Sequence, residues 1–196
     1  MRKAPKGFTL IELLVTLAVA AIVVTMAVPS FQSMINGNRL TSAANEMIGS
    51  LQLARSEAMR RNARAGVCMS TGTNTGVDAA CAVANVDGWI TFVDVNDDGA
   101  YDDDDNDVLL RTFRLDGPIV HGLSADVGTN TVMFRPDGLA RDQDSGAGPG
   151  SGLLDGTIRF CVVASQPTEN ARDVEIASGS RIASVRSDED GLCPAP

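Results

Sequence analysis

The chain has 196 residues, a formal net charge of −9, one histidine and four cysteines. About 130 residues follow the N-terminal helical region, enough for one globular domain and too few for two. The acidic balance disfavours non-specific nucleic-acid binding, which depends on clustered lysine and arginine. His121, the only histidine, offers a single base with no evident orienting partner, so we expect a strand or surface position for it and no enzymatic activity.

The first 28 residues combine a short basic head with a long apolar run. Three basic residues precede Gly7, and the 21 residues from Phe8 to Val28 carry a single ionisable group, Glu12. A run of this length is sufficient to span a bilayer. A carboxylate inside such a run costs about 2.5–3.5 kcal/mol on insertion scales, which makes Glu12 a candidate functional residue.

Two other interpretations of this segment fit less well. A secretory signal has an apolar core of about 7–15 residues followed by a small-x-small cleavage site. Residues 18–20 (Ala-Val-Ala) offer such a site, but the apolar run continues for eight further residues. A plain single-span anchor would require no glutamate at position 12.

Residues 29–65 are predicted to form an amphipathic helix. Pro29 is expected to end or kink the apolar helix before it, since it lacks an N–H and clashes with the preceding turn. Apolar residues then recur at alternating spacings of four and three, which places them on one face: Leu40, Ala44, Met47, Leu51, Ala54 and Ala58. Four arginines near the end complement the helix dipole, and Gly66 is the expected stop. A helix from Phe8 to about Asn62 would be about 80 Å long.

From Gly66 onward, short runs of β-forming residues alternate with turn residues. The predicted strands are Gly88–Val95, Val108–Leu115, Thr131–Phe134, Gly156–Ala164, Arg172–Ala177 and Arg181–Arg186. The expected fold is therefore α+β. A long N-terminal helix, with a membrane or filament-core half and an amphipathic half, packs against a C-terminal antiparallel β-sheet domain.

An acidic segment between two predicted strands accounts for most of the net charge. Eight aspartates lie between positions 94 and 107, and without them the net charge falls to −1. Oxygen-bearing residues occupy positions 1, 3, 5, 9 and 12 of a calcium-loop spacing, with glycine at position 6: Asp94, Asn96, Asp98, Asp102 and Asp105. Strands rather than helices flank the segment, which excludes an EF-hand. Calcium is thus a candidate ligand, although no cofactor is required, and the alternative is a solvated acidic hairpin tip.

The N-terminal segment resembles the class III signal of type IV pilins and pseudopilins, in its basic head, its Gly7-Phe8 junction and Glu12. The resemblance implies that a prepilin peptidase cleaves after Gly7 and that Phe8 is then N-methylated. It also implies that Glu12 pairs with the terminal ammonium of a neighbouring subunit. Two buried charges that are each costly alone would then stabilise each other.

The rest of the chain is similar to the GspH/FimT branch of the same superfamily. The similarity lies in the helix end Leu53–Asn62, in the Gly88–Asp94 segment and in the C-terminal Cys193. Members of the branch are non-catalytic subunits that join or prime filaments. The implied organisation is a leader peptide at 1–7, a transmembrane or filament-core helix at 8–28, an amphipathic helix at 29–65 and a periplasmic β-rich domain at 66–196.

Four cysteines in an exported domain favour disulfides over metal thiolates, and three pairings are open. Cys68 and Cys81 flank a loop rich in glycine, threonine and asparagine, which makes a local bridge plausible. A bridge between Cys161 and Cys193 would staple the C-terminal tail to the sheet. We favour this pair of bridges, and the resemblance supports the second, because family members often carry a C-terminal bridge.

The resemblance implies a minor pilin of a type IV pilus that helps to initiate assembly or forms part of the tip. The precursor is expected in the inner membrane of a Gram-negative cell as a single-pass protein, with its C-terminal domain in the periplasm, before it enters an envelope filament. Expected partners are the prepilin peptidase/N-methyltransferase, other pilin or pseudopilin subunits and the inner membrane. The first alternative is a minor pseudopilin of a type II secretion system.

The second alternative is a DNA-binding minor pilin that acts in DNA uptake. Arg181 and Arg186 are similar in position to the Gly-Arg motif of minor pilins that bind DNA, but the spacing differs. Three acidic residues at positions 188–190 follow at once and would repel phosphate. Nucleic acid is therefore not an expected partner.

Overall fold

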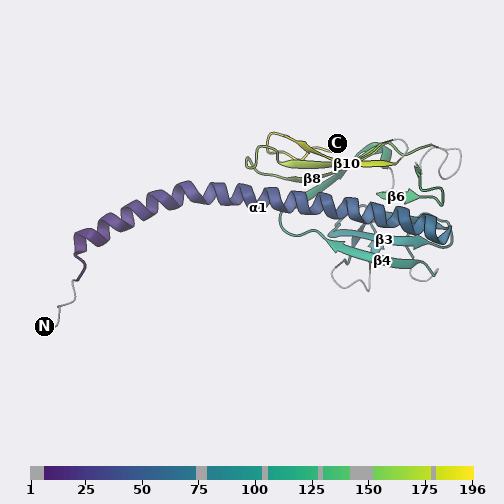
Figure 1. Ribbon diagram of the computed structural model, residues 1–196, viewed down its shortest axis with the longest axis horizontal. Coiled ribbons are helices and arrows are strands. Elements are labelled where there is room, and N and C mark those ends of the chain that lie inside the picture. Colours follow the sequence, from purple (N-terminus) through teal and green to yellow (C-terminus); the bar gives the residue numbers. More distant parts are fainter. Residues whose placement is uncertain (1–6, 74–78, 103–105, 128–129, 142–151, 178–179) are drawn as a thin grey trace.

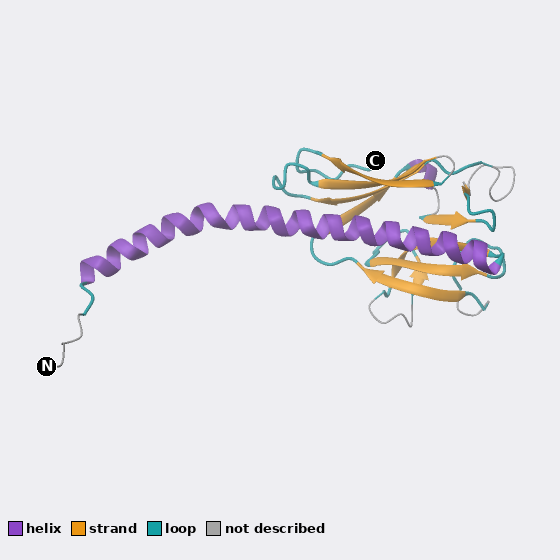
Figure 2. Cartoon of the chain, in the orientation of Figure 1, coloured by secondary structure: helices purple, strands orange, loops and turns teal. Residues whose placement is uncertain are grey.

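The computed structural model describes residues 7–73, 79–102, 106–127, 130–141, 152–177 and 180–196. One long helix, α1 (Leu10–Arg61), leads into a β domain that surrounds only its C-terminal half (Figures 1 and 2). The N-terminal half of α1 extends away from the domain. The α+β architecture predicted from the sequence is confirmed.

The C-terminal half of α1 is buried along one stripe. Every residue of the predicted apolar face is at most 1 % exposed: Leu40, Ala44, Met47, Leu51, Ala54 and Ala58. Ala43 and Ser50 are buried beside them. Because most of these side chains are small, the strands lie close to the helix axis, and helix and sheets share one core.

The predicted limits of the helix are met only in part. α1 runs through Pro29 without ending there, and Figure 1 shows that it curves within its exposed half, so of the two expected effects of this proline the end is wrong. The helix ends at Arg61 because Asn62 takes a left-handed conformation (φ 52°) and its N–H bonds to the carbonyl of Ala58. Gly66 is not the stop, since it lies within the first strand.

Within the described ranges, ten strands form two antiparallel sheets rather than the single sheet expected. The larger sheet has the order β4-β3-β1-β6-β7, with β2 also paired to β1. Its strands are β1 (Arg64–Thr71), β2 (Ala80–Cys81), β3 (Gly88–Asp94), β4 (Val108–Arg114), β6 (Thr131–Phe134) and β7 (Ala140–Arg141). The smaller sheet has the order β10-β9-β8-β5. Its strands are β5 (Ile119–Leu123), β8 (Gly156–Val162), β9 (Ala171–Ala177) and β10 (Arg181–Ser187), and a short 3-10 helix, η1 (Ala125–Val127), follows β5.

The core lies where both sheets meet α1. Trp89 of β3 is fully buried, stacks on Phe113 of β4 with ring centroids 4.4 Å apart, and also contacts Phe160 of β8. Its indole N–H donates to the hydroxyl of Ser50 on α1 at 2.9 Å. This single residue therefore connects the helix to both sheets, and its one polar atom is satisfied inside the core.

Gly66 provides a test of how closely β1 and β6 pack. A Cβ at this buried position would lie 2.1 Å from Sδ of Met133 and 2.9 Å from the carbonyl oxygen of Val132. We expect Gly66→Ala to lower the free energy of unfolding of the full-length protein in detergent by about 1–3 kcal/mol, because β6 must shift. Urea denaturation followed by the fluorescence of Trp89, the only tryptophan, measures this effect.

Gly49→Ala is the matched control. Gly49 lies on the exposed side of α1, and a Cβ added there would have no atom of another element within 4 Å. Alanine at this position should raise stability by up to about 1 kcal/mol, since it is the better helix former. Equal effects of the two substitutions would contradict the close packing at Gly66.

Candidate functional site

The exposed N-terminal half of α1 is the dominant surface feature of the molecule. Its large apolar side chains are exposed from Phe8 to Ile35: Phe8, Leu10, Ile11, Leu13, Leu14, Val15, Leu17, Val19, Ile22, Val23, Val24, Val28, Phe31, Met34 and Ile35. An exposed apolar surface of this size marks a membrane or protein interaction site. Within the described residues, α1 is the one helix long and apolar enough to cross a membrane, and none of its most apolar window is buried.

The predicted processing residues lie at the start of this helix. Gly7 and Phe8 precede it in non-helical conformation and are exposed. Thr9 is the N-cap, and its hydroxyl accepts a hydrogen bond from the backbone N–H of Glu12 at 3.3 Å. The Thr-x-x-Glu spacing of a capping box signals this start in the sequence. The predicted helix began at Phe8 because that signal was not used. Cleavage after Gly7, methylation of Phe8 and the pairing of Glu12 stay predictions.

Hydrogen bonds from the backbone organise the acidic loop that follows β3. The carboxylate of Asp94, 1 % exposed, accepts from the N–H groups of Asp98 at 3.2 Å and Gly99 at 2.9 Å. Asp107 accepts from the N–H groups of Val95 and Asp102. The loop is thus folded around two carboxylates, as in Asx turns.

The charge around Asp94 is balanced in part by Arg64, whose Nε lies 3.5 Å from Oδ2 of Asp94. Burial raises the pKa of the Asp94 carboxyl, while the N–H of Gly99 and the Arg64 guanidinium oppose this rise. Asn96, Asp98 and Asp102 share the loop, and Asp105 lies outside the described residues. The described residues hold no ready cluster of three or more metal-binding side chains. Calcium binding by this loop stays a prediction.

The acidic loop also covers the outer face of the larger sheet. Tyr101 packs edge-on against Phe92 of β3, with ring centroids 5.6 Å apart. A second apolar cluster forms there from Phe92, Ile90, Met133 and both cysteines of the predicted Cys68–Cys81 bridge. That disulfide is present, with Cα atoms 5.5 Å apart. The segment is therefore not merely a solvated hairpin tip, because part of it closes a small core.

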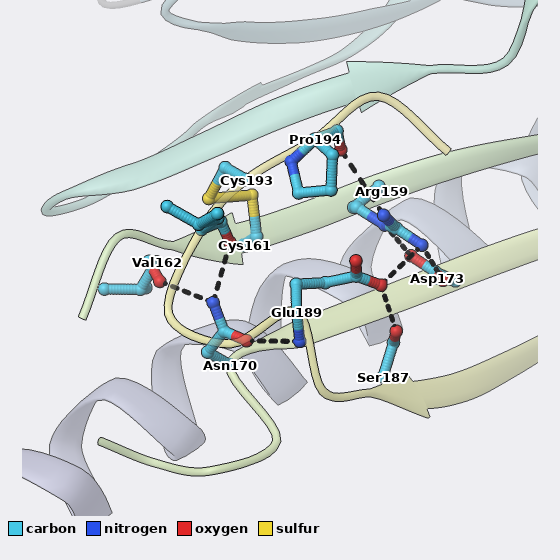
Figure 3. Close-up of a disulfide and its surroundings, with 10 residues drawn as sticks. Arg159, Cys161, Val162, Asn170, Asp173, Ser187, Glu189, Cys193 and Pro194 are labelled. Carbon is cyan, nitrogen blue, oxygen red and sulfur yellow. Dashed lines mark hydrogen bonds and ion pairs between the residues drawn. A yellow bond between two sulfur atoms is a disulfide. The ribbon is translucent and has the colours of Figure 1, made fainter. Parts of the chain in front are cut away.

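The second predicted disulfide, Cys161–Cys193, is also present and fastens the C-terminal tail across β8 (Figure 3). Asn170, fully buried, supports the same tail. Its amide group donates to the carbonyl of Leu192 at 2.8 Å, and its side-chain oxygen accepts from the N–H of Glu189 at 2.9 Å. The tail is thus held by side-chain amide bonds as well as by the covalent bridge.

Arg159 holds the far end of the tail, as Figure 3 shows. Its guanidinium makes two hydrogen bonds to Asp173, at 2.7 and 2.8 Å, and a 2.9 Å ion pair with Glu189. It also donates to the carbonyl of Pro194 at 3.3 Å. The hydrogen bond with Asp173 raises the pKa of Arg159. The sequence did not predict this clamp, because nothing in a single sequence pairs residue 159 with residue 189.

The structure does not bring the two arginines of the DNA-uptake hypothesis together. Arg181 and Arg186 lie near opposite ends of the edge strand β10, and their odd spacing puts them on opposite faces. Arg186 pairs with Glu169 at 3.3 Å. His121 lies half-buried in β5, as expected for a strand position, and burial lowers its pKa. DNA binding by these arginines stays a prediction, without a shared patch to support it.

An exposed apolar half-helix joined to a disulfide-stapled β domain defines a pilin-like filament subunit. The profile described as the prokaryotic N-terminal methylation motif matches residues 2–28, which implies processing by a prepilin peptidase. The profile described as type II transport protein GspH matches residues 43–180. The chain therefore belongs to the GspH family, which confirms the predicted GspH/FimT branch, a family of structural pilins and pseudopilins.

Two solved structures are similar to the chain, both of the type IV minor pilin FimU of Pseudomonas aeruginosa. One has 18 % sequence identity and a TM-score of 0.49, and the match covers 80 % of this chain and 93 % of that one. The other, in a second crystal form, has 18 % identity and a TM-score of 0.48, with 74 % and 92 % covered. No curated protein sequence matches the chain.

Asn170 allows a test of the tail clamp that leaves both disulfides intact. We expect Asn170→Ala to lower the free energy of unfolding by about 2 kcal/mol, because it leaves the Glu189 N–H and the Leu192 carbonyl without their partner. It should also speed hydrogen exchange of the Glu189 N–H under non-reducing conditions. Asn38→Ala, an exposed position on α1, is the control and should neither lower stability nor change exchange in the tail. A stable variant with a protected tail would show that the disulfide alone holds the tail.

Proposed function

We propose that this chain is a minor pilin of a type IV pilus, with a non-catalytic role in starting the filament or forming its tip. The precursor is held in the inner membrane, with the β domain in the periplasm. Prepilin peptidase removes residues 1–7 and methylates Phe8. The subunit then moves from the membrane into the filament, where its apolar half-helix joins the core.

The observation that carries the proposal is the run of exposed apolar side chains between Phe8 and Ile35. In the described part of the chain, no other element covers this surface. It needs an apolar environment, and both a bilayer and a bundle of neighbouring α1 helices supply one. A single segment can therefore serve first as a membrane anchor and then as the filament core.

Glu12 would favour the transfer of the subunit from the membrane to the filament. In the bilayer, an isolated carboxylate is unfavourable. In a filament, the terminal ammonium of a neighbouring subunit would offset that cost, because paired buried charges are far less costly than single ones. The same residue thus disfavours the membrane state and favours the assembled one.

Two features favour a pilus over a secretion pseudopilus. Both disulfides and the tail clamp stabilise a domain that would leave the envelope on a surface filament. The description of the matched family favours the second candidate function, a minor pseudopilin of a type II secretion system. A strain without the gene distinguishes the two. We expect loss of sheared surface pili with secreted proteins unchanged, and the reverse result would support the secretion role.

Glu12→Ala tests the assembly contact. We expect normal cleavage, seen as a mobility shift on gels, but at least about tenfold less subunit in sheared filaments, because an unpaired ammonium would remain in the core. Thr16→Ala, an exposed substitution one turn further along α1, is the control and should assemble normally. Normal incorporation of the Glu12 variant would contradict the pairing.

The absence of lysine from the processed chain sharpens this test. Lysine occurs only at positions 3 and 6, so cleavage after Gly7 leaves the amine of Phe8 as the sole amine of the subunit. Zero-length carbodiimide crosslinking of filaments should therefore attach this subunit through Phe8 to a carboxylate of a neighbour, and Glu12 to a neighbour's terminal amine. Mass spectrometry of the crosslinked peptides identifies both.

A further inference from the structure

A groove of about 460 Å³ opens between α1 and the connection from β4 to β5. Arg39, Ser42 and Ala43 of α1 form one wall. The other is formed by Phe113, Leu115, Asp116, Gly117 and Ile119. Its apolar lining comes from Phe113, Leu115 and Ile119. Figure 1 shows this connection crossing α1 at the end of the domain nearest the exposed half-helix. The groove therefore lies at the end of the domain from which the exposed half-helix extends.

Two opposite charges line the groove without partners in the described part of the chain. Arg39 and Asp116 are both exposed, and neither makes a hydrogen bond or ion pair with any described residue. Gly117, with φ +81°, leaves room for the guanidinium. A Cβ there would lie 2.8 Å from Nη1 of Arg39. A cation and an anion beside an apolar floor form a site for a ligand that carries both charges.

Arg39 lies on the side of the β domain that is nearest the membrane-spanning part of α1. Phe31, Ile35 and Arg39 follow each other at spacings of four, so they lie on one face of the helix, and the first two are exposed and apolar. Arg39 lies about 6 Å beyond Ile35 along the axis. The continuous apolar run ends at Val28, and Arg39 lies about 16 Å further along the axis. Between them, exposed apolar residues alternate with polar ones, and a tilted helix would bring one side of the domain down toward the headgroups.

We infer that this groove binds the headgroup of a zwitterionic phospholipid while the subunit resides in the membrane, with Arg39 on the phosphate and Asp116 on the ammonium. The inference rests on the membrane-anchored stage of the proposed function and not on the kind of filament. Guanidinium–phosphate and carboxylate–ammonium contacts are charge-assisted and strong for their size. The bound headgroup would hold the β domain against the membrane until assembly withdraws the subunit.

Charge favours a zwitterionic lipid over an anionic one. Asp116 stands in the groove, and Asp188 and Asp190 lie near the β8–β9 turn, which contacts Asn36 of α1 and so belongs to the same end of the domain. These carboxylates repel a lipid of net negative charge, whereas an ammonium group next to the phosphate meets Asp116 favourably.

Trp89 is a built-in probe of the groove, because Phe113 lines the groove and stacks on Trp89. Full-length protein is reconstituted at high dilution into phosphatidylcholine vesicles that contain phosphatidylcholine with a nitroxide on the headgroup. We expect this lipid to quench Trp89 more than phosphatidylcholine with a nitroxide near the chain terminus. The combined Arg39→Gln and Asp116→Asn variant should show about fivefold weaker headgroup quenching, because it loses the guanidinium–phosphate contact and the attraction between Asp116 and the choline cation.

The matched control combines Arg114→Gln with Asp155→Asn, which changes the same charges outside the groove at exposed positions. It should be quenched like the unmodified protein. An unchanged emission maximum without nitroxide shows that each variant is folded, and vesicle flotation shows that the helix is inserted. Replacing half of the phosphatidylcholine by phosphatidylglycerol should reduce the difference between the unmodified protein and the groove variant.

Three results would overturn the inference. Equal quenching of the groove variant and the unmodified protein, with both floating, would reject the groove and leave the proposed function intact. Headgroup quenching no stronger than chain-terminus quenching, with the protein floating, would also reject the groove as a headgroup site. Failure of the unmodified protein to float would contradict membrane anchoring, and with it both the inference and the membrane stage of the proposed function.

Discussion

The structure depends on one continuous helix that must satisfy two different environments. Up to Ile35 its large apolar side chains are exposed, and from Leu40 onward one stripe is buried against the sheets while the other faces are polar. The change occurs within about one turn and without a break in the backbone. Because the helix is continuous, whatever fixes its first half in a bilayer or a filament also fixes the orientation of the β domain. The β domain therefore has no hinge at its junction with the exposed half of α1, because the helix that extends from it is also part of its core.

Small residues on α1 explain why two sheets can share this helix. Alanines at positions 43, 44, 54 and 58 let backbones approach, and the larger Leu40, Met47 and Leu51 fill the space between the sheets. Trp89 then spans from Ser50 on the helix to Phe160 in the opposite sheet. With the helix removed, both sheets would lose much of the cover of their inner faces. The helix is therefore the centre of the core and not an attachment to a finished domain.

Sequence patterns predicted the elements with the most periodic residues and missed those whose partners are distant. The helix, its buried stripe, six of the strands and both disulfides are confirmed. The strand Arg64–Thr71 was missed because the arginines before it extend the helical pattern, and the end of the helix depends on the left-handed Asn62, which sequence alone did not reveal. The strand Ile119–Leu123 was missed because it includes His121 and Gly122, whose β pairing is set by β8. The Arg159 clamp and the Arg39 groove both join residues far apart in sequence, so no local pattern signals them.

The arginines of the subunit serve mainly to stabilise the fold. Lysine occurs only in the leader, so every side-chain cation of the processed subunit is an arginine. Most of those described serve the fold: Arg159 clasps the tail, Arg64 supports the acidic loop, and Arg60 lowers the pKa of Glu57 to about 2 with help from Arg61. The planar guanidinium suits such roles because it bonds in a fixed geometry. Arg39, like Arg114 and Arg181, has no partner among the described residues, but of these three only Arg39 stands at the boundary between the apolar and the packed halves of α1. In the headgroup site inferred above, this charge would contact the membrane, while Arg159, Arg64 and Arg60 contact the fold.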